Sequence, residues 1–454
     1  MRDGDRQPAE PLGIVLMDHP VQYFVPGLRR LAALPGVRSR SYYDRVSAEG
    51  FHDPGFDRRV RWNTDLHSGY DWWTPPKPGR RRGWWTVLRS LHRDRPDVLI
   101  SFGWVGRICR LGFLYALVTR TPILFFSDAN IRDPRPLSRR ARLRRRVLRA
   151  GFRLAAGALA TGSANHAFYL AHGIPPERLY PGVYSADVDL FFAAADRRRA
   201  AGIDPADRPF VIGYVGKFIP IKAVDDLIEA CARLDPGIDW ELWLIGDGPL
   251  RVELTGLVDR LGITDRVRMF GFRNTDEVPD LVARMDVLVL PSHVEPRGLV
   301  AVEAAAAGAV PVVSSVTGVW GPGDPIEHGI SGLVYPVGDI GALADCLRRL
   351  SGDPGLRRGL TAEARERAAG QGARAFAATM AAAIAEIGGR RRNRVPGPRP
   401  ELPRSRGGRP ASPATSDPGA RVAGVRGGGR TGGRSVLDQL PGHDGDTGRP
   451  STER

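Results

Sequence analysis

The chain has 454 residues, of which 42% are hydrophobic and 26% charged, with a net charge of +16. This length predicts two or three domains, and the composition excludes collagen-like, coiled-coil and wholly disordered proteins. The excess positive charge lies in two segments: 132–153 holds ten arginines against one acidic residue, and 390–454 holds 14 against six. The rest of the chain is close to neutral, so a general nucleic-acid-binding role loses most of its support.

Residues 1–12 are polar and lack the apolar core of a secretion signal. The longest apolar stretch, 111–126, is shorter than the roughly 20 residues that a membrane-spanning helix needs. Three widely separated cysteines, Cys109, Cys231 and Cys346, show no metal or redox spacing. We therefore expect reduced thiols in a cytoplasmic protein without a transmembrane segment.

In chain order, short apolar runs alternate with segments of helical spacing. The first half has predicted strands over 13–17, 97–101 and 122–126, with a helix over 21–34 after the first of them. The second half has predicted strands over 210–215, 241–245, 267–270, 287–290 and 310–313, and its first helix covers 223–234. This alternation predicts two α/β domains, each a parallel sheet with helices on both faces.

We place the flexible leader at 1–12, the first domain at 13–190 and the second at 209–370, and we expect a helix over 371–388 to return to the first domain. Between the first strands, 46–82 is rich in Trp, Pro, Gly and Arg and predicts a long functional loop. From 389 to 454 Gly, Pro, Arg and Ser dominate. Such a segment buries too little apolar surface to offset its chain entropy, so we expect a disordered tail.

Two carboxylates, Glu295 and Glu303, follow the strand 287–290 with Gly298 between them. Glycine lets the backbone approach a ligand closely, and the amides at the start of a helix favour an anion. These features suit a ligand that carries both a diphosphate and sugar hydroxyls. The alternative is a plain strand-to-helix turn whose acidic residues stabilise the helix dipole.

Two of the few lysines, Lys217 and Lys222, follow the strand 210–215 and flank the start of a helix. Ligands of doubly wound sheets bind at the carboxyl ends of the strands, and lysine is a compact charge suited to phosphate. Two solvated surface lysines are the alternative interpretation.

With these motifs the second half resembles the nucleotide-sugar-binding domain of retaining glycosyltransferases of the GT4 type (glycosyl transferases group 1), which have the GT-B fold. Glu295, Gly298, Glu303 and Gly308 match the family's Glu-Pro-x-Gly-x-x-x-x-Glu-Ala-x-x-x-Gly motif. Residues 216–223 match Gly-Arg-x-x-x-x-Lys-Gly, with lysine for arginine at 217 and alanine for glycine at 223. Stretches at 19–23, 53–56, 127–130, 162–165, 246–249 and 329–339 extend the resemblance over about 13–385.

The resemblance implies two Rossmann-like doubly wound domains facing a cleft. It implies transfer of a sugar, with retention, from a nucleoside-diphosphate donor to a glycan or lipid-linked acceptor, without metal or cofactor. Rival interpretations are a nucleotide-sugar epimerase of the same fold, or a catalytically silent module that binds a sugar nucleotide or a membrane. No specific nucleic-acid partner is expected.

The resemblance also implies roles for individual residues. Lys217 and Lys222, with the turn at Gly216, would neutralise the donor diphosphate, and Glu303 would hold the ribose. The transferred sugar and its phosphate would be held by Glu295 and the amides of Arg297, Gly298, Leu299 and Val300. The predicted catalytic residues are Glu295, Lys222, His19 and Asp128, the last two being at the ends of first-half strands. For His19 the alternative is a hydrogen-bonded turn residue.

Residues 137–155 predict a basic amphipathic helix. Its apolar face consists of Leu137, Ala141, Leu148, Phe152 and Ala155. A stripe of arginines three and four residues apart runs beside it: Arg139, Arg142, Arg146, Arg149 and Arg153. Such a helix predicts peripheral association with the anionic inner face of the plasma membrane. An ordinary surface helix, with its apolar face on the sheet, is the alternative.

Overall fold

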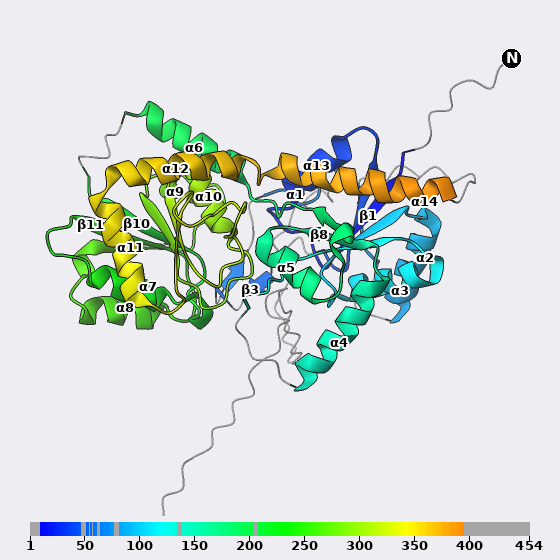
Figure 1. The fold of residues 1–454 in the computed structure, drawn as a ribbon, viewed down its shortest axis with the longest axis horizontal. Helices are drawn as coiled ribbons and strands as arrows, with labels where there is room; N and C mark the ends of the chain where they lie inside the picture. The colour runs from blue at the N-terminus through cyan, green and yellow to red at the C-terminus, as the bar shows by residue number, and fades with distance from the viewer. Residues whose placement is uncertain are drawn as a thin grey trace, which may run out of the picture.

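The computed structural model describes residues 10–46, 51–53, 55–56, 58–60, 64–76, 81–133, 139–202 and 208–394. Its described residues form two halves that lie side by side, each built on a parallel sheet with helices on both faces (Figure 1). This confirms the two-domain α/β architecture predicted from the alternation of apolar runs.

The first sheet has seven strands among the described residues, all parallel, in the order β5-β2-β1-β6-β7-β8-β9. Their bounds are β1 Leu12–Met17, β2 Arg38–Tyr43, β5 Trp72–Trp73, β6 Val98–Phe102, β7 Ile123–Phe126, β8 Gly157–Ala160 and β9 Leu179–Pro181. The helices of this half are α1 Val25–Ala33, α2 Arg81–Asp94, α3 Arg107–Thr119, α4 Arg139–Leu154 and α5 Ser163–Ala171. A short 3-10 turn, η1 Pro176–Arg178, precedes β9.

The second sheet has six described strands in the order β12-β11-β10-β13-β14-β15. Their bounds are β10 Phe210–Val215, β11 Trp240–Ile245, β12 Val267–Gly271, β13 Val287–Leu290, β14 Val310–Ser314 and β15 Leu333–Tyr335. Its helices are α7 Val224–Ala232, α8 Arg251–Arg260, α9 Val278–Val282, α10 Leu299–Ala307, α11 Ile340–Gly352 and α12 Pro354–Ala369. The 3-10 turns η3 Pro220–Lys222 and η4 Thr264–Arg266 also belong here, and α6 Val188–Ala200 leads in from the first half.

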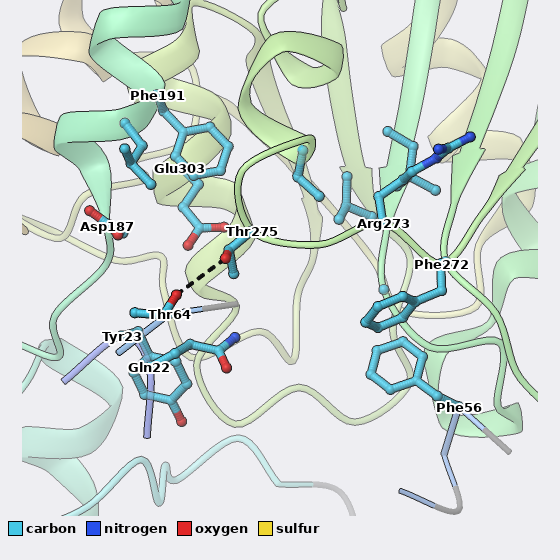
Figure 2. A pocket seen from close by; sticks show the side chains of 16 residues that line it. Gln22, Tyr23, Phe56, Thr64, Asp187, Phe191, Phe272, Arg273, Thr275 and Glu303 are labelled. Carbon is cyan, nitrogen blue, oxygen red and sulfur yellow. Dashed lines mark hydrogen bonds between the residues drawn. The ribbon is translucent and has the colours of Figure 1, made fainter. Parts of the chain in front are cut away.

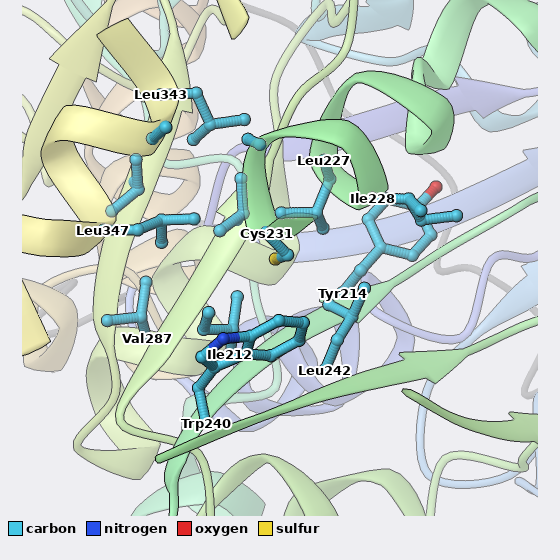
Figure 3. Close-up of a cluster of buried hydrophobic side chains, with 14 of the residues drawn as sticks. Ile212, Tyr214, Leu227, Ile228, Cys231, Trp240, Leu242, Val287, Leu343 and Leu347 are labelled. Carbon is cyan, nitrogen blue, oxygen red and sulfur yellow. The ribbon is translucent and has the colours of Figure 1, made fainter. Parts of the chain in front are cut away.

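Apolar side chains from both faces of the second sheet form its core. On one face Ile212 and Leu242 of the sheet pack with Leu227 of α7 and Leu347 of α11 (Figure 3). On the other face, the alanine-rich helix α10 packs against α6 and α12. Small side chains on α10 let these helices approach closely, and this places the start of α10 at the edge of the sheet.

The final helices return to the first half. Figure 1 shows α12, α13 Ala373–Ala383 and α14 Gly389–Arg394 running along one side of both halves, with a π-helical turn η5 Ile384–Gly388 before α14. Phe376 of α13 is buried in the cluster that contains Leu28 of α1. A Cβ atom on Gly27 would lie 2.3 Å from the Phe376 ring, so glycine is needed for this close approach.

Two predictions from composition require correction. The segment 46–82 is not only a loop, because it contains the antiparallel strands β3 Phe51–Asp53 and β4 Arg58–Val60 and the strand β5. Trp73 of β5 packs on Tyr42 of β2, with ring centroids 4.7 Å apart. The predicted disordered tail begins later than 389, because 389–394 form α14. The remainder of that prediction, 395–454, lies outside the described residues.

An ion pair joins α14 to the first sheet. Arg392 Nε donates to Asp97 Oδ2 at 3.0 Å, and the same carboxylate oxygen accepts from the backbone N–H of Leu12 at 2.9 Å. Asp97 is fully buried, so its charge depends on these donors.

Arg392→Ala should therefore lower the free energy of unfolding by about 1–3 kcal/mol, the cost of leaving a buried charge short of one donor. Arg390→Ala is the matched control, because Arg390 is exposed and pairs with exposed Glu386 at 2.9 Å. That change should stay within about 0.5 kcal/mol. Urea denaturation checks both, and equal effects of the two substitutions would contradict the anchoring role of Arg392.

Candidate functional site

The two sequence motifs meet where the strand order of the second sheet reverses. The loop 216–223 follows β10 and the loop 291–298 follows β13, and these strands are neighbours in the sheet. The N–H of His293 donates to the carbonyl of Ile221 at 2.9 Å and joins the loops. In doubly wound sheets the crevice at such a switch point is the usual place for a ligand.

The predicted residues Lys222 and Glu295 form a buried ion pair at this point. Lys222 Nζ lies 2.6 Å from Glu295 Oε2, and the side chains are only 17% and 10% exposed. Ser292 Oγ donates to the same carboxylate oxygen at 3.2 Å. A buried pair of this kind is costly to desolvate and gives little net stability, so its position at a crevice favours a functional role.

The backbone of both loops is specialised. Gly298, directly before α10, has φ 84°, and a Cβ there would lie 2.9 Å from Thr317 Cγ2. Ala223, directly before α7, has φ 47°, in the left-handed region that disfavours a Cβ atom. The alanine that departs from the family motif thus keeps the conformation for which glycine is suited.

Ala223→Gly should accordingly leave the free energy of unfolding unchanged or raise it by up to about 1 kcal/mol, while Ala223→Val should lower it by more than that. Thermal unfolding of the two variants measures this difference. A valine variant as stable as the glycine variant would contradict the assigned backbone conformation.

A pocket of about 850 Å³, which includes open solvent, lies beside these loops and takes its walls from both halves (Figure 2). Gly216, Gly246 and Phe272 contribute from the carboxyl ends of β10, β11 and β12. The other lining residues are Gln22, Tyr23, Phe56, Thr64, Asp187, Leu190, Phe191, Val215, Ile245, Arg273, Thr275, Val278 and Glu303. Of the predicted donor-binding residues, only Gly216 and Glu303 belong to this lining.

Glu303 reaches the pocket from α10 and faces Asp187 and Phe191 (Figure 2). Burial raises the pKa of its carboxyl from 4.5 to about 7, and the negative charge of Asp187 adds to the rise. Burial also raises the pKa of Tyr23, to about 12. Glu303 is therefore poised to change charge near neutral pH, which is uncommon for a carboxyl group and typical of functional sites.

Lys217 does not line the pocket, but it contacts Phe56, which does. Its Nζ lies 5.2 Å from the centroid of the Phe56 ring, and Phe56 packs edge-on against Phe272 with centroids 5.2 Å apart. The contact with Phe56 fixes the lysine against the first half of the chain. The two predicted lysines thus lie apart, one on an aromatic wall and one on Glu295.

The side chain of Arg297 is buried between the halves. It donates to the carbonyl of Gly318 at 3.2 Å, and the negative charge of Asp128 lies close enough to act on its pKa. Burial lowers the pKa of Arg297, while the charges of Asp324 and Asp128 oppose that shift. The prediction for Arg297 concerned its backbone amide, and its side chain serves the contact between the halves.

Polar contacts from the first half hold the Glu295 loop and the segment 317–324 of the second half. The amide of Asn130 donates to the carbonyl of Pro296 at 2.8 Å, and Asp324 accepts from the backbone N–H and hydroxyl of Ser163 at 2.9 and 2.6 Å. Arg132 donates to the carbonyl of Trp320 at 2.7 Å and stacks on its ring. Sequence reasoning assigned no role to these residues, although Asn130 and Ser163 lie in stretches that resemble the family.

His19 lies at the end of β1, as predicted, and is partly buried. Burial lowers the pKa of its imidazole from 6.5 to about 4, and the positive charge of Arg45 adds to the fall. The ring is therefore neutral at neutral pH. His293 pairs with Asp226, with Nε2 and Oδ2 2.8 Å apart, and is half exposed.

Within the described ranges, no group of three or more His, Cys, Asp or Glu side chains is arranged to hold a metal ion. In the same part of the chain, no helix combines the length and apolar character needed to cross a membrane.

The match to a known protein family lies in the second half of the chain. The family model for glycosyl transferases group 1 matches residues 197–367. An alpha-D-kanosaminyltransferase of Streptomyces kanamyceticus is 35% identical over 190 residues, 40% of this chain and 48% of the relative. The lipopolysaccharide core biosynthesis glycosyltransferase LpsE of Rhizobium meliloti is 39% identical over 167 residues, 37% of this chain and 46% of the relative. The matches thus span about half the length of these curated relatives.

Solved structures resemble the whole described body. HepE of Anabaena, crystallised in complex with UDP, aligns with a TM-score of 0.62 over 83% of this chain and all of its own, at 20% identity. Sucrose-phosphate synthase from Thermosynechococcus elongatus aligns with a TM-score of 0.59 over 83% of this chain, at 22% identity. These likenesses establish the fold, which is GT-B as the motifs implied. The motif-bearing part of the chain, residues 197–367, matches the model of the glycosyl transferases group 1 family.

Proposed function

We propose that this protein is a glycosyltransferase that moves a sugar from a nucleoside-diphosphate donor to an acceptor hydroxyl, with retention of the anomeric configuration. The observation that carries the proposal is the buried Lys222–Glu295 pair at the switch point of the second sheet, beside a pocket that contains Glu303. A cation for a diphosphate and two carboxylates for hydroxyl groups then lie around one crevice.

The positions of these residues suggest which part of the donor each would bind. Glu303 and Gly216 line the pocket at the ends of β10 to β12, so the nucleoside would occupy that side, with the ribose hydroxyls on Glu303. Lys222 and the amides at the start of α10 would face the diphosphate. Glu295, which already accepts from Lys222 and Ser292, would bind hydroxyls of the transferred sugar.

The chemical step breaks the bond between the anomeric carbon and the diphosphate oxygen. Negative charge develops on that oxygen, and the positive charge of Lys222 stabilises it. The acceptor oxygen then bonds to the anomeric carbon from the face that the diphosphate leaves, and its proton passes to the departing phosphate. In this route the configuration is retained, and no protein nucleophile or metal is required.

The names of the relatives support a sugar donor but leave the acceptor open. HepE has been crystallised with UDP-glucose, and we expect this chain to use a related nucleotide sugar. Among the relatives, one is an N-acetyl-alpha-D-glucosaminyl L-malate synthase and another takes part in lipopolysaccharide core biosynthesis. We propose a glycan or lipid-linked acceptor, held chiefly by the first half of the chain at the cytoplasmic side of the membrane.

The test is a transfer assay with nucleotide sugars of uracil, guanine and adenine and a library of glycan and lipid-linked acceptors. Release of nucleoside diphosphate should depend on the acceptor, and nuclear magnetic resonance should show the donor's anomeric configuration in the product. The Glu295→Gln variant is the control and should lower turnover at least as much as donor affinity. Inverted product would contradict the retaining mechanism. Free epimerised sugar formed without acceptor would favour the epimerase interpretation instead.

A further inference from the structure

The helix α4 has an exposed apolar stripe in addition to the face that it packs on the core. Leu148 and Phe152 point to the core, and Phe152 is fully buried. The apolar face that was predicted to meet a membrane therefore packs on the sheet, as in the alternative of an ordinary surface helix. On the opposite side Leu143, Val147 and Leu154 are 63%, 66% and 64% exposed. These three positions and Ala150 are spaced four, three and four residues apart, so they form one continuous line along the helix.

A second exposed apolar stripe lies on the neighbouring helix α3. Leu114, Leu117 and Val118 are 50%, 43% and 77% exposed. The two helices meet at Phe113 and Gly151, where a Cβ on the glycine would lie 3.6 Å from the ring. On the helix surfaces, Leu117 is the neighbour of Phe113, and Val147 and Leu154 are the neighbours of Gly151.

The two stripes lie next to the contact of Phe113 with Gly151, and together they are called the α3–α4 face. It consists of Leu114, Leu117 and Val118 of α3 and Leu143, Val147, Ala150 and Leu154 of α4. In Figure 1 α4 projects from the lower edge of the first half, with its start toward the junction of the halves, and α3 lies beyond its end. The face is thus open to a partner.

Arginines border this face, and neither helix contains an acidic residue. Arg110 of α3 and Arg146, Arg149 and Arg153 of α4 are exposed. The sequences of α3 and α4 contain no Asp or Glu. The interface of an anionic lipid bilayer contains both acyl chains and negatively charged headgroups. An apolar stripe bordered only by positive charge is complementary to both.

We infer that the α3–α4 face docks the protein on an anionic membrane, with Leu143 and Val147 in the acyl boundary and the arginines at the lipid phosphates. The apolar stripe favours a lipid bilayer over a nucleic acid, because phosphate backbones need only the positive charge. The α4 helix begins shortly after Arg132, whose contacts with Thr317 and Trp320 join the two halves. The inference does not depend on the transfer activity.

The experiment is co-sedimentation of the full-length protein with vesicles. Equal parts phosphatidylcholine and phosphatidylglycerol form the anionic vesicles, and phosphatidylcholine alone forms the neutral ones. The protein should bind the anionic vesicles at least about tenfold more tightly, and added salt should weaken that binding.

Two variants separate the charged and apolar contributions. Arg146→Glu/Arg149→Glu should weaken binding to the anionic vesicles by about 30-fold or more. Leu143→Gln/Val147→Gln should weaken it by about tenfold, because two exposed apolar side chains no longer enter the acyl boundary. The matched control is Val252→Gln/Arg260→Glu on α8 of the second half, where both residues are exposed, and it should bind as the natural protein does.

Three results would overturn the inference. Unchanged binding of the Arg146→Glu/Arg149→Glu variant would show that basic residues elsewhere, such as those of 395–454, account for it. Unchanged binding of the Leu143→Gln/Val147→Gln variant would show adsorption by charge alone. A protein that dimerises without lipid, and loses the dimer in the Leu143→Gln/Val147→Gln variant, would show that a second copy covers the face.

Discussion

Lys222→Ala should lower kcat/KM for sugar transfer by at least about 100-fold. The substitution removes the cation that lies 2.6 Å from Glu295 and leaves that carboxylate buried without its partner. Loss of one charge-assisted contact weakens binding by about 10- to 150-fold, and a developing negative charge on the leaving phosphate adds to the loss in turnover. Steady-state kinetics with a nucleotide sugar and a working acceptor measure the effect.

Two controls separate chemistry from folding. Lys222→Arg keeps the charge and should recover part of the rate, whereas an effect of packing alone would not be rescued by the longer side chain. Thermal unfolding of each variant shows whether the fold is intact. A Lys222→Ala protein that is folded and retains activity within about threefold of the original would remove Lys222 from the proposed mechanism.

The second large effect concerns Glu303, whose substitution should stabilise the fold while weakening donor binding. With a folded pKa of about 7 and an ordinary value of 4.5, the folded chain holds this proton more tightly than the unfolded chain. The free energy of unfolding therefore falls as pH rises between these two values and is lowest above about 7. Glu303→Gln removes the buried charge and should raise the free energy of unfolding by about 3 kcal/mol at pH ~8, with little change at pH ~4.

Donor binding should show the opposite dependence on pH. If the ionised carboxylate accepts from the ribose hydroxyls, affinity for a nucleotide sugar should rise about tenfold between pH ~6 and ~8, as Glu303 loses its proton. A nucleotide sugar is the suitable ligand, because its diphosphate is esterified at both ends and does not titrate there. His19 is not the source of such a change, since its pKa lies near 4.

Glu303→Gln should bind the donor weakly and without this pH dependence. Calorimetric titration at the two pH values, for the original protein and the variant, measures both the affinity and its slope. Equal pH dependence in the variant would assign the titration to another group, and a variant that unfolds more easily at pH ~8 would contradict the raised pKa.

The strands that flank the site were predictable because almost all of their residues are buried. The runs 210–215 and 287–290 coincide with β10 and β13, since each is apolar throughout and ends at glycine or proline. The short strand β5 was missed, because two tryptophans in a segment rich in proline and arginine carry no strand pattern. Its place depends on the contact of Trp73 with Tyr42, which is far away in the sequence.

The site itself was predictable only in part, for a related reason. Spacing and resemblance identified Glu295 and Lys222, and the sheet topology brings them into contact. The hydrogen bond from Asn130 to the carbonyl of Pro296 joins residues of different domains. No local sequence pattern predicts which side chains meet between domains. In the same way, composition assigned α14 to the tail, because the bond of Arg392 to Asp97 is a tertiary contact.

We propose that the pocket beside the Lys222–Glu295 pair binds a nucleoside diphosphate. A crystal structure of the protein soaked with the tightest-binding of UDP, GDP and ADP tests it most directly. We expect the nucleoside in the pocket with its ribose on Glu303, and the diphosphate between Lys222 and the start of α10. A nucleotide bound elsewhere on the chain, with this pocket occupied only by water, would contradict it.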